Sequence, residues 1–301
     1  MPYSLENRLV IGVSSRALFD LTKENEIYET KGIEEYCKYQ IENETNILQP
    51  GPGFKLIKAL LKLNTLPNME NRVEVIVMSR NSADTSLRVF NSIAHYGLGI
   101  SRAVLASGAS LAPYLTSFKT DLFLSANEED VQMAINSNIA AGIICPEHDY
   151  EILPDEEISQ IRIAFDGDAV LFADESERIY QEQGLEAFEK NEMDNADDPL
   201  HEGPFAKFLM TLSAIQKEFK NQPMPIRTAL VTARSAPAHE RVIKTLRAWD
   251  VRIDEAFFLG GITKSEVLKA FGAHIFFDDQ VVHASRASKV VPSARVPIKK
   301  V

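Results

Sequence analysis

Short apolar runs that end in polar residues recur along this chain, and segments with helical spacing lie between them. In the second half, the runs cover residues 161–165, 228–232, 256–259 and 274–277. After the second run, Val242, Leu246 and Trp249 recur at helical spacing, which predicts a helix from Pro237 to about Trp249 with the tryptophan in the core. Strands that alternate with helices favour an α/β fold with a doubly wound parallel sheet. Ligands of such sheets bind beyond the carboxyl ends of the strands.

The same pattern is present twice. The stretch IGVSSRALFDL, from Ile11, aligns with IAFDGDAVLFA, which begins 152 residues later at Ile163. Four further pairs follow in the same order: YETKGIEEY with YQEQGLEAF, LQPGP with LHEGP, VIVMSRNS with ALVTARSA, and ASGASLAPYLTSFKTDLFLSAN with LGGITKSEVLKAFGAHIFFDDQ. Matches in one order over most of each half indicate two tandem, duplicated halves.

We expect each half to form a domain, 1–150 and 151–301, with the boundary in the acidic, proline-containing segment 146–160. Each half also has a polar, partly helical insert between its first and second strands, which covers about 176–225 in the second half. An insert at this point can close over the strand ends and exclude water, so we expect it to act as a cap.

The two halves differ in the polar residues that follow their strands. The second half carries an acidic or basic group, or a hydroxyl, after each strand: Asp166, Asp168, Thr232, Arg234, Lys264, Asp278 and Asp279, with Ala233 between Thr232 and Arg234. The aligned positions of the first half lack most of these charges: Ser14, Arg16, Met78, Leu111, Ser125 and Ala126. Since the apolar frame is kept while the charges are lost, we expect the second half to be catalytic and the first to be a scaffold.

Carboxylates directly behind an apolar strand are costly to desolvate without a partner. A metal ion or a charged substrate would offset that cost. Magnesium takes hard oxygen ligands and is usually held by one or two carboxylates together with substrate phosphate. We therefore expect a Mg²⁺ site, with its ligands among Asp166, Asp168, Asp278 and Asp279.

These segments resemble the haloacid-dehalogenase-like phosphohydrolases, with all four motifs of that superfamily in order. The chain is most similar to the cytosolic 5′-nucleotidase type I family, through AFDGDAVLFADESERI, IRTALVTARSA, DEAFFLGG and HIFFDDQ, and through YCKYQIENE and LQPG in the first half. The resemblance covers nearly the whole chain. It implies a Mg²⁺-dependent hydrolysis of nucleoside 5′-monophosphates, often with AMP favoured, and two haloacid-dehalogenase-like halves.

The resemblance also implies roles for the two aspartates of the first motif. Asp166 would be the nucleophile and would form an aspartyl-phosphate, which divides one difficult displacement into two easier ones. Asp168 would protonate the leaving 5′-oxygen and then deprotonate the attacking water. A non-catalytic nucleotide-binding regulatory protein remains an alternative, although a pure binder needs no such acid. Another small phosphorylated metabolite as substrate remains open as well.

The other motif residues would bind the phosphate and the metal ion. Thr232 and the backbone N–H groups at the following turn, from Ala233 on, would bind phosphate oxygens. Lys264 would neutralise the nucleophile and the transferring oxygens. Asp278 would hold Mg²⁺ directly, and Asp279 would help to position it.

Four side chains allow two interpretations each. Arg234 would contact the phosphate or base, or form a structural salt bridge, because its counterpart Arg80 is present in the first half. Arg16 and Arg80 would form an anion pocket for an effector nucleotide, or serve as plain scaffold. His283 would have a structural role or lie near the active site.

Bulk properties exclude several partners. The net charge of −11 and the pI near 5.1 argue against a nucleic-acid partner, which needs a basic face. The two cysteines, Cys37 and Cys145, form no CxxC pair and are expected to be packing residues in a reducing compartment. Since the sequence shows neither a signal peptide nor an apolar run of about 18 residues, we expect a cytoplasmic protein without a membrane partner. Whether it forms a homo-oligomer is open.

Overall fold

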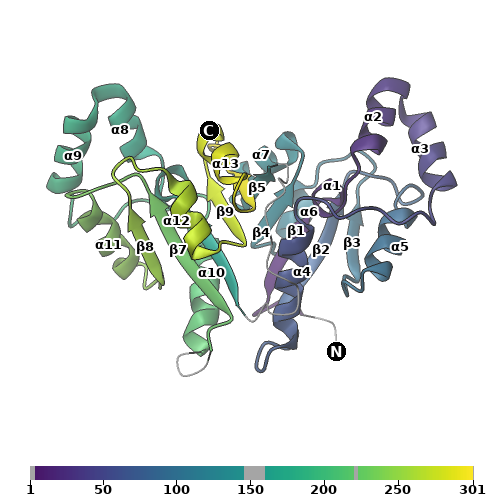
Figure 1. The fold of residues 1–301 in the computed structure, drawn as a ribbon, viewed down its shortest axis with the longest axis horizontal. Helices are drawn as coiled ribbons and strands as arrows, with labels where there is room; N and C mark the ends of the chain where they lie inside the picture. The colour runs from purple at the N-terminus through teal and green to yellow at the C-terminus, as the bar shows by residue number, and fades with distance from the viewer. Residues whose placement is uncertain (1–3, 146–159, 220–222, 301) are drawn as a thin grey trace. The chain divides into compact units, whose positions relative to one another are not determined.

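A computed structural model describes residues 4–145, 160–219 and 223–300 of the chain. It has an α/β fold with ten mostly parallel strands (Figure 1). The chain divides into two compact units, residues 1–139 and 140–301. The segment in which the sequence predicted a domain boundary, 146–160, lies outside the described residues except for its last position.

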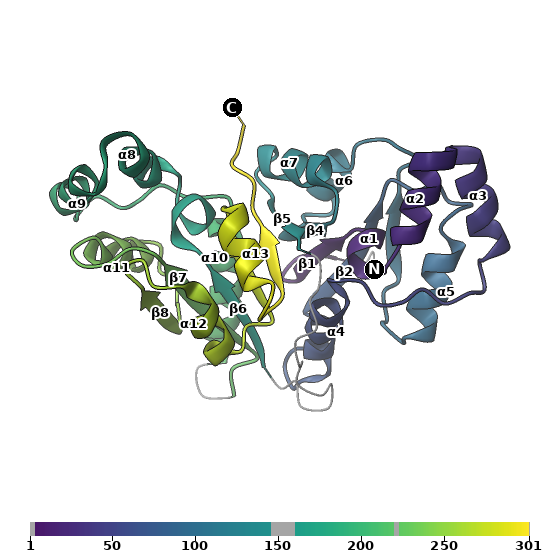
Figure 2. The same ribbon diagram turned by 45° about the horizontal axis from the view of Figure 1, so that its top comes forward.

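The first unit is built on four parallel strands in the order β3-β2-β1-β4: β1 (Leu9–Val13), β2 (Val73–Ser79), β3 (Arg102–Leu105) and β4 (Leu122–Ser125). The helices α2 (Thr22–Lys31) and α3 (Ile33–Glu42) form a hairpin between β1 and β2 (Figure 2). Gly32 joins them with φ of 84°, a conformation that a residue without a Cβ adopts readily. The other helices are α1 (Ser15–Leu18), α4 (Phe54–Lys62), α5 (Leu87–His95), α6 (Ala112–Ser117) and α7 (Glu128–Asn136), with a short 3₁₀ turn at Leu63–Thr65.

The second unit contains strands in the order β8-β7-β6-β9-β10-β5: β6 (Ile161–Phe165), β7 (Ile226–Thr232), β8 (Glu255–Phe258), β9 (Ile275–Asp278), β10 (Ser293–Arg295) and β5 (Ala140–Ile144). The strands from β8 to β10 are parallel, and β10 pairs antiparallel with β5. The helices are α8 (Glu175–Gln183), α9 (Leu185–Asp194), α10 (Ala206–Glu218), α11 (His239–Ala248), α12 (Lys264–Phe271) and α13 (Val281–Ala287).

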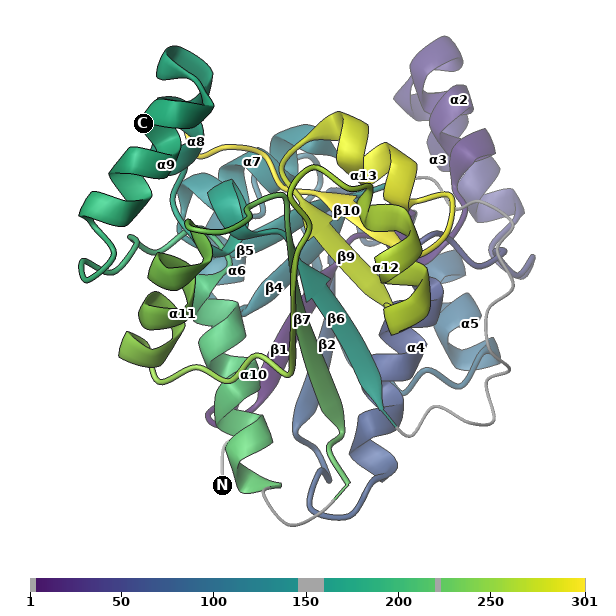
Figure 3. The ribbon, with the colours of Figure 1, turned by 60° about the vertical axis from the view of Figure 1, so that its left-hand side comes forward.

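Apolar layers cover both faces of these strands, with α12 and α13 on one face and α10 and α11 on the other (Figure 3). Successive side chains of a strand point to opposite faces. Ala164 accordingly packs in a core with Leu268 of α12, whereas Phe165 stacks on Phe277 and meets Phe208 of α10 at 6.1 Å. Because β6 is buried on both faces, its carboxyl end is held in place. The residues that directly follow it therefore start from a fixed position.

The strands predicted from the apolar runs are present: β6 has the predicted boundaries, and the boundaries of the others differ by at most two residues. The helix expected from Pro237 to Trp249 is α11. Trp249 lies directly after this helix, and the centroid of its ring is 5.6 Å from that of Phe172. The short strands β5 and β10 were not predicted. Cys37 and Cys145 are free and half-buried. Among the described residues, no helix has the length and apolarity needed to span a membrane.

The two units agree in several respects when each is taken by itself. Both have four parallel strands in equivalent order, and in both a helical hairpin and a third helix separate the first strand from the second. In the second unit, α10 is the third helix, and its apolar face, including Phe208, Leu209 and Leu212, is buried. These similarities support the duplication inferred from sequence, which stays a prediction.

Candidate active site and metal site

The candidate site lies at the carboxyl ends of β6 and β9. Strand β6 is flanked by β7 on one side and β9 on the other, so the chain crosses over in opposite directions from this point. Such a switch point leaves a crevice at the strand ends of an open α/β sheet. Asp166 directly follows β6, Asp278 ends β9, and Lys264 begins α12.

A tight turn fixes the carboxylate of Asp166. The backbone N–H of Gly167 donates to Asp166 Oδ1 at 2.8 Å, at the start of the turn Gly167–Leu171, in which Asp168 and Ala169 have non-helical backbone angles. A Cβ on Gly167 would lie 3.3 Å from Thr232 Oγ1, so glycine allows the turn to approach the end of β7 closely. Thr232 Oγ1 accepts a hydrogen bond of 3.2 Å from the N–H of Arg234, while Ala233 between them is exposed.

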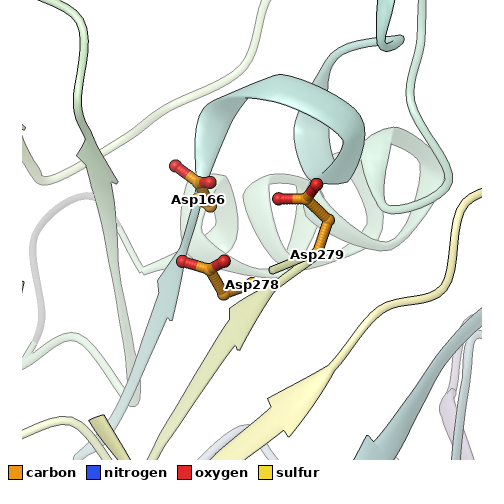
Figure 4. Close-up of side chains that lie close together, drawn as sticks. All are labelled: Asp166, Asp278 and Asp279. Atoms are coloured by element: carbon orange, nitrogen blue, oxygen red, sulfur yellow. The ribbon is translucent and has the colours of Figure 1, made fainter. Parts of the chain in front are cut away.

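Three carboxylates gather beside one ammonium group. Oxygens of Asp166, Asp278 and Asp279 lie within 4.8 Å of one another (Figure 4). Lys264 Nζ lies 2.9 Å from Asp166 Oδ1 and 2.7 Å from Asp278 Oδ2. Lys264, Asp166 and Asp278 are buried, and His283 Nδ1 lies 3.7 Å from Asp278 Oδ2. Of the two interpretations of His283, the structure thus supports a position near the site.

The pKa values show how much negative charge the cluster concentrates. Burial, together with the neighbouring Asp278, raises the pKa of Asp166 to about 7, although Lys264 opposes the shift. Burial and the charges of Asp166 and Asp278 raise the pKa of Asp279 to about 8. Burial would also raise the pKa of Asp278, but His283, Lys264 and the N–H of Gln280 hold it below its usual value. One lysine therefore does not compensate three carboxylates.

The residues present fit a divalent cation. Hard carboxylate oxygens from three residues are close enough to share one ion, and a second positive charge beyond Lys264 would allow all three to ionise. Asp168 lies outside this group of three. Of the four metal ligands that the sequence predicted, the structure brings Asp166, Asp278 and Asp279 together.

Asp168 faces Arg234 instead. Arg234 Nε lies 2.8 Å from Asp168 Oδ2, and Arg234 Nη2 lies 2.6 Å from Asp168 Oδ1, so the pair is bidentate. Arg234 Nη1 also binds Glu192 of α9, and its side chain is only 2% exposed. These contacts support the structural interpretation of Arg234, while substrate binding by Arg234 stays a prediction.

Glu192 is a residue that sequence reasoning missed. Its side chain is fully buried and binds two arginines, Arg234 and Arg241, the latter at 3.1 Å from Oε1. Ser176 Oγ donates to Glu192 Oε1 at 2.8 Å, which links α8 to α9. The available signal was the spacing of four between the buried Phe188 and Glu192, which places the carboxylate on the inner face of α9.

Comparisons with known proteins identify the family to which this chain is similar. A family model described as 5′-nucleotidase matches residues 1–301. The human (Homo sapiens) protein named cytosolic 5′-nucleotidase 1B is 41% identical over an alignment of 299 residues, and the alignment covers 96% of this chain and 48% of that protein. The chain therefore spans about half the length of this curated relative. A solved histidinol dehydrogenase from Elizabethkingia anophelis aligns over 79% of this chain and 48% of its own with 9% identity and a TM-score of 0.22, too weak a likeness to carry an argument.

Proposed function

Because the chain belongs to the 5′-nucleotidase family, we propose that it hydrolyses nucleoside 5′-monophosphates, with AMP as the first candidate, to a nucleoside and phosphate. The observation that carries the proposal is the cluster of Asp166, Lys264, Asp278 and Asp279 at the ends of β6 and β9, in which all but the partly exposed Asp279 are buried. We assign this unit to the haloacid-dehalogenase-like phosphohydrolases and the first unit to a related frame without the cluster.

Magnesium is the ion that we assign to the cluster, with Asp166, Asp278 and Asp279 as its protein ligands. The bound ion would neutralise the phosphate and the carboxylates, so that two anions can approach one another. Lys264 contributes the same effect from the protein itself, because its ammonium group already lies between Asp166 and Asp278. Positioning and charge stabilisation of this kind account for most of phosphoryl-transfer catalysis.

Asp166 supplies the nucleophile in the proposed reaction. One of its carboxylate oxygens forms a bond to phosphorus while the bond from phosphorus to the 5′-oxygen breaks, which leaves an aspartyl-phosphate and the nucleoside. Water then attacks the phosphorus, releases phosphate and restores Asp166. The hydroxyl of Thr232 and the backbone N–H of Ala233 stand at the end of β7, where they would bind the phosphate oxygens.

Asp168 moves the protons in both steps. It gives a proton to the leaving 5′-oxygen and takes one from the attacking water. In the described arrangement both of its oxygens bind Arg234, so Asp168 must exchange one of these contacts for the substrate. Glu192 then retains Arg234 near the site, which would restore the pair after each turnover.

The hairpin α8–α9 is the part of the predicted insert that we propose as a cap. Arg234 lies 5.3 Å from the Phe188 ring of α9, so this helix already contacts the group that holds Asp168. Helix α10, by contrast, is packed into the core. Selection of the base would come from the hairpin or from the first unit.

The name of the human relative, together with the acidic charge, supports a cytosolic protein with a small-molecule substrate and neither a nucleic-acid nor a membrane partner.

A phosphate-release assay tests the proposal. The panel contains AMP, other nucleoside monophosphates, sugar phosphates and an aryl phosphate, each with Mg²⁺ and with EDTA. We expect Mg²⁺-dependent release from nucleoside monophosphates, and no release from Asp166→Asn, which should still bind AMP. Faster phosphate release from a sugar phosphate than from AMP would show that the substrate is another phosphomonoester. No release from any compound would favour a nucleotide-binding protein without turnover.

A further inference from the structure

A cavity of about 410 Å³ lies inside the first unit, at the carboxyl ends of β1, β2 and β4. Its walls come from these strand ends, from the loop after β3 and from the hairpin α2–α3, and all of its lining residues belong to this unit. Small-molecule pockets typically have volumes of ~300–1,000 Å³. Within its own unit, the cavity occupies the place that the carboxylate cluster has in the second unit.

Hydroxyl groups replace the catalytic carboxylates in this cavity. Ser14 follows β1 and Ser125 ends β4, and both are buried. Ser14 Oγ accepts from the N–H of Ala17 at 3.1 Å, and Ser125 Oγ accepts from the N–H of Asn127 at 3.0 Å. A hydroxyl that accepts in this way still has a proton to donate. The two groups can therefore bind an anionic oxygen without a metal ion, and neither is a carboxylate nucleophile.

The charges of the cavity are arranged for an anion. Its two lining carboxylates are already paired: Glu24 lies 2.6 Å from Arg88, and Asp130 lies 2.5 Å from Arg80. Arg16 occupies the position aligned with Asp168, is exposed at the cavity, and makes no carboxylate contact among the described residues. Of the two arginines predicted to form an anion pocket, Arg80 is thus held in ion pairs and Arg16 remains available.

Aromatic and apolar groups form the other end of the cavity. Tyr28 of α2 and Tyr36 of α3 meet edge to face, with ring centroids 5.8 Å apart, and Ile33 lies beside them. Tyr28 is 52% exposed, although it is a large aromatic side chain. Exposed aromatic faces of this kind pack well against a planar ring system.

We propose that this cavity binds a nucleoside phosphate and does not hydrolyse it. The phosphate would bind the hydroxyls of Ser14 and Ser125 and the guanidinium of Arg16, and the base would lie against Tyr28 and Tyr36. The proposal concerns a second binding site and needs no turnover at the first, so the two can fail independently.

Calorimetric titration of the Asp166→Asn variant with AMP in Mg²⁺ tests the proposal, because this variant should bind AMP without consuming it. We expect two AMP molecules per chain. Adding Arg16→Glu should weaken one of the two sites at least tenfold and leave the other unchanged. Adding Lys31→Glu, a charge reversal at an exposed position of α2 that does not line the cavity, is the matched control and should change neither site.

A second variant tests the base end. Tyr28→Ala, at an exposed position, should weaken the site that depends on Arg16 several-fold. If only one AMP binds per chain and Arg16→Glu abolishes this binding, the bound AMP occupies the cavity. The site that fails to bind AMP is then the one in the catalytic unit. If AMP binding is the same with and without Arg16→Glu, the proposal is wrong, whatever the phosphate-release assay shows.

Discussion

At the scale of the residue, the first prediction concerns proton transfer by Asp168, whose carboxylate binds Arg234. Asp168→Asn should slow AMP hydrolysis by about 10²–10⁴-fold, the usual contribution of a general acid. The defect should be smaller with an aryl phosphate, because a good leaving group needs less protonation. The measurement is single-turnover formation of the aspartyl-phosphate with both substrates. Since the substitution also disturbs the contact with Arg234, an equal defect on both substrates would indicate a positioning role and contradict the proton transfer.

His274 gives a prediction about stability and pH. Its Nδ1 accepts from the backbone N–H of Arg162 at 3.1 Å, and burial with the nearby charge of Arg162 lowers its pKa to about 4. The unfolded chain, with an ordinary histidine pKa of about 6.5, therefore binds more protons between these two values. Stability from this group is complete above about pH 6.5 and is lost as the pH falls towards about 4.

The variant His274→Asn isolates that effect, because an amide oxygen can replace Nδ1 as the acceptor. Between pH 7.5 and pH 4.5, the wild-type protein should lose on the order of 2 kcal/mol more unfolding free energy than the variant. Urea unfolding at both values measures the difference. Equal losses in the two proteins would show that His274 is protonated as readily in the folded state as in the unfolded chain.

At the scale of the element, Glu192 attaches the α8–α9 hairpin to the rest of the unit. Its buried carboxylate binds Arg234 after β7 and Arg241 of α11, and it accepts from Ser176 of α8. Removing one member of a buried ion pair typically costs about 3–5 kcal/mol, because the partner charge stays buried and uncompensated. Glu192→Gln should therefore lower the thermal unfolding midpoint by several degrees.

Glu189→Gln is the matched control for this prediction. Glu189 is a partly exposed carboxylate of the same helix, and its substitution should leave the midpoint within about a degree. Glu192→Gln should also change kcat for AMP more than for an aryl phosphate, since it frees Arg234, which holds Asp168. A midpoint that shifts equally in both variants would mean that the network does not hold the hairpin.

The elements that sequence predicted well are those with strong apolar patterns. Strand β6 is buried on both faces, and its end points match the apolar run 161–165. Strand β10 has only three residues and pairs with β5, which is far away in the sequence, so no local pattern identified either strand. The carboxylate cluster followed from the rule that parallel strands present their ends together, whereas the pairing of Asp168 with Arg234 and Glu192 depends on side-chain packing that spacing does not encode.

At the scale of the whole molecule, the two units contrast in charge on similar frames. The second unit concentrates Asp166, Asp278 and Asp279 at its switch point, and the aligned positions of the first unit hold Ser14, Ser125 and Ala126. A frame that keeps its apolar residues needs no carboxylates at these positions in order to fold. Their presence in the second unit is therefore best explained by chemistry, and the first unit is free to bind a ligand that it does not transform.

The same contrast predicts one divalent-cation site per chain. Three carboxylates with oxygens within 4.8 Å of one another can share one ion, whereas the hydroxyls of Ser14 and Ser125 offer a cation no negative charge, and the nearby guanidinium of Arg16 repels it. Titration of the metal-free chain with Mn²⁺, followed by the paramagnetic signal of the free ion, should give one bound ion.

Asp279→Asn should weaken that binding at least tenfold, since it removes one charged ligand without touching Lys264. Ser125→Ala should leave the binding unchanged, as the matched substitution in the first unit. Two bound ions per chain, or one that is lost with Ser125→Ala and retained in Asp279→Asn, would place metal chemistry in the first unit and contradict the division of roles between the two.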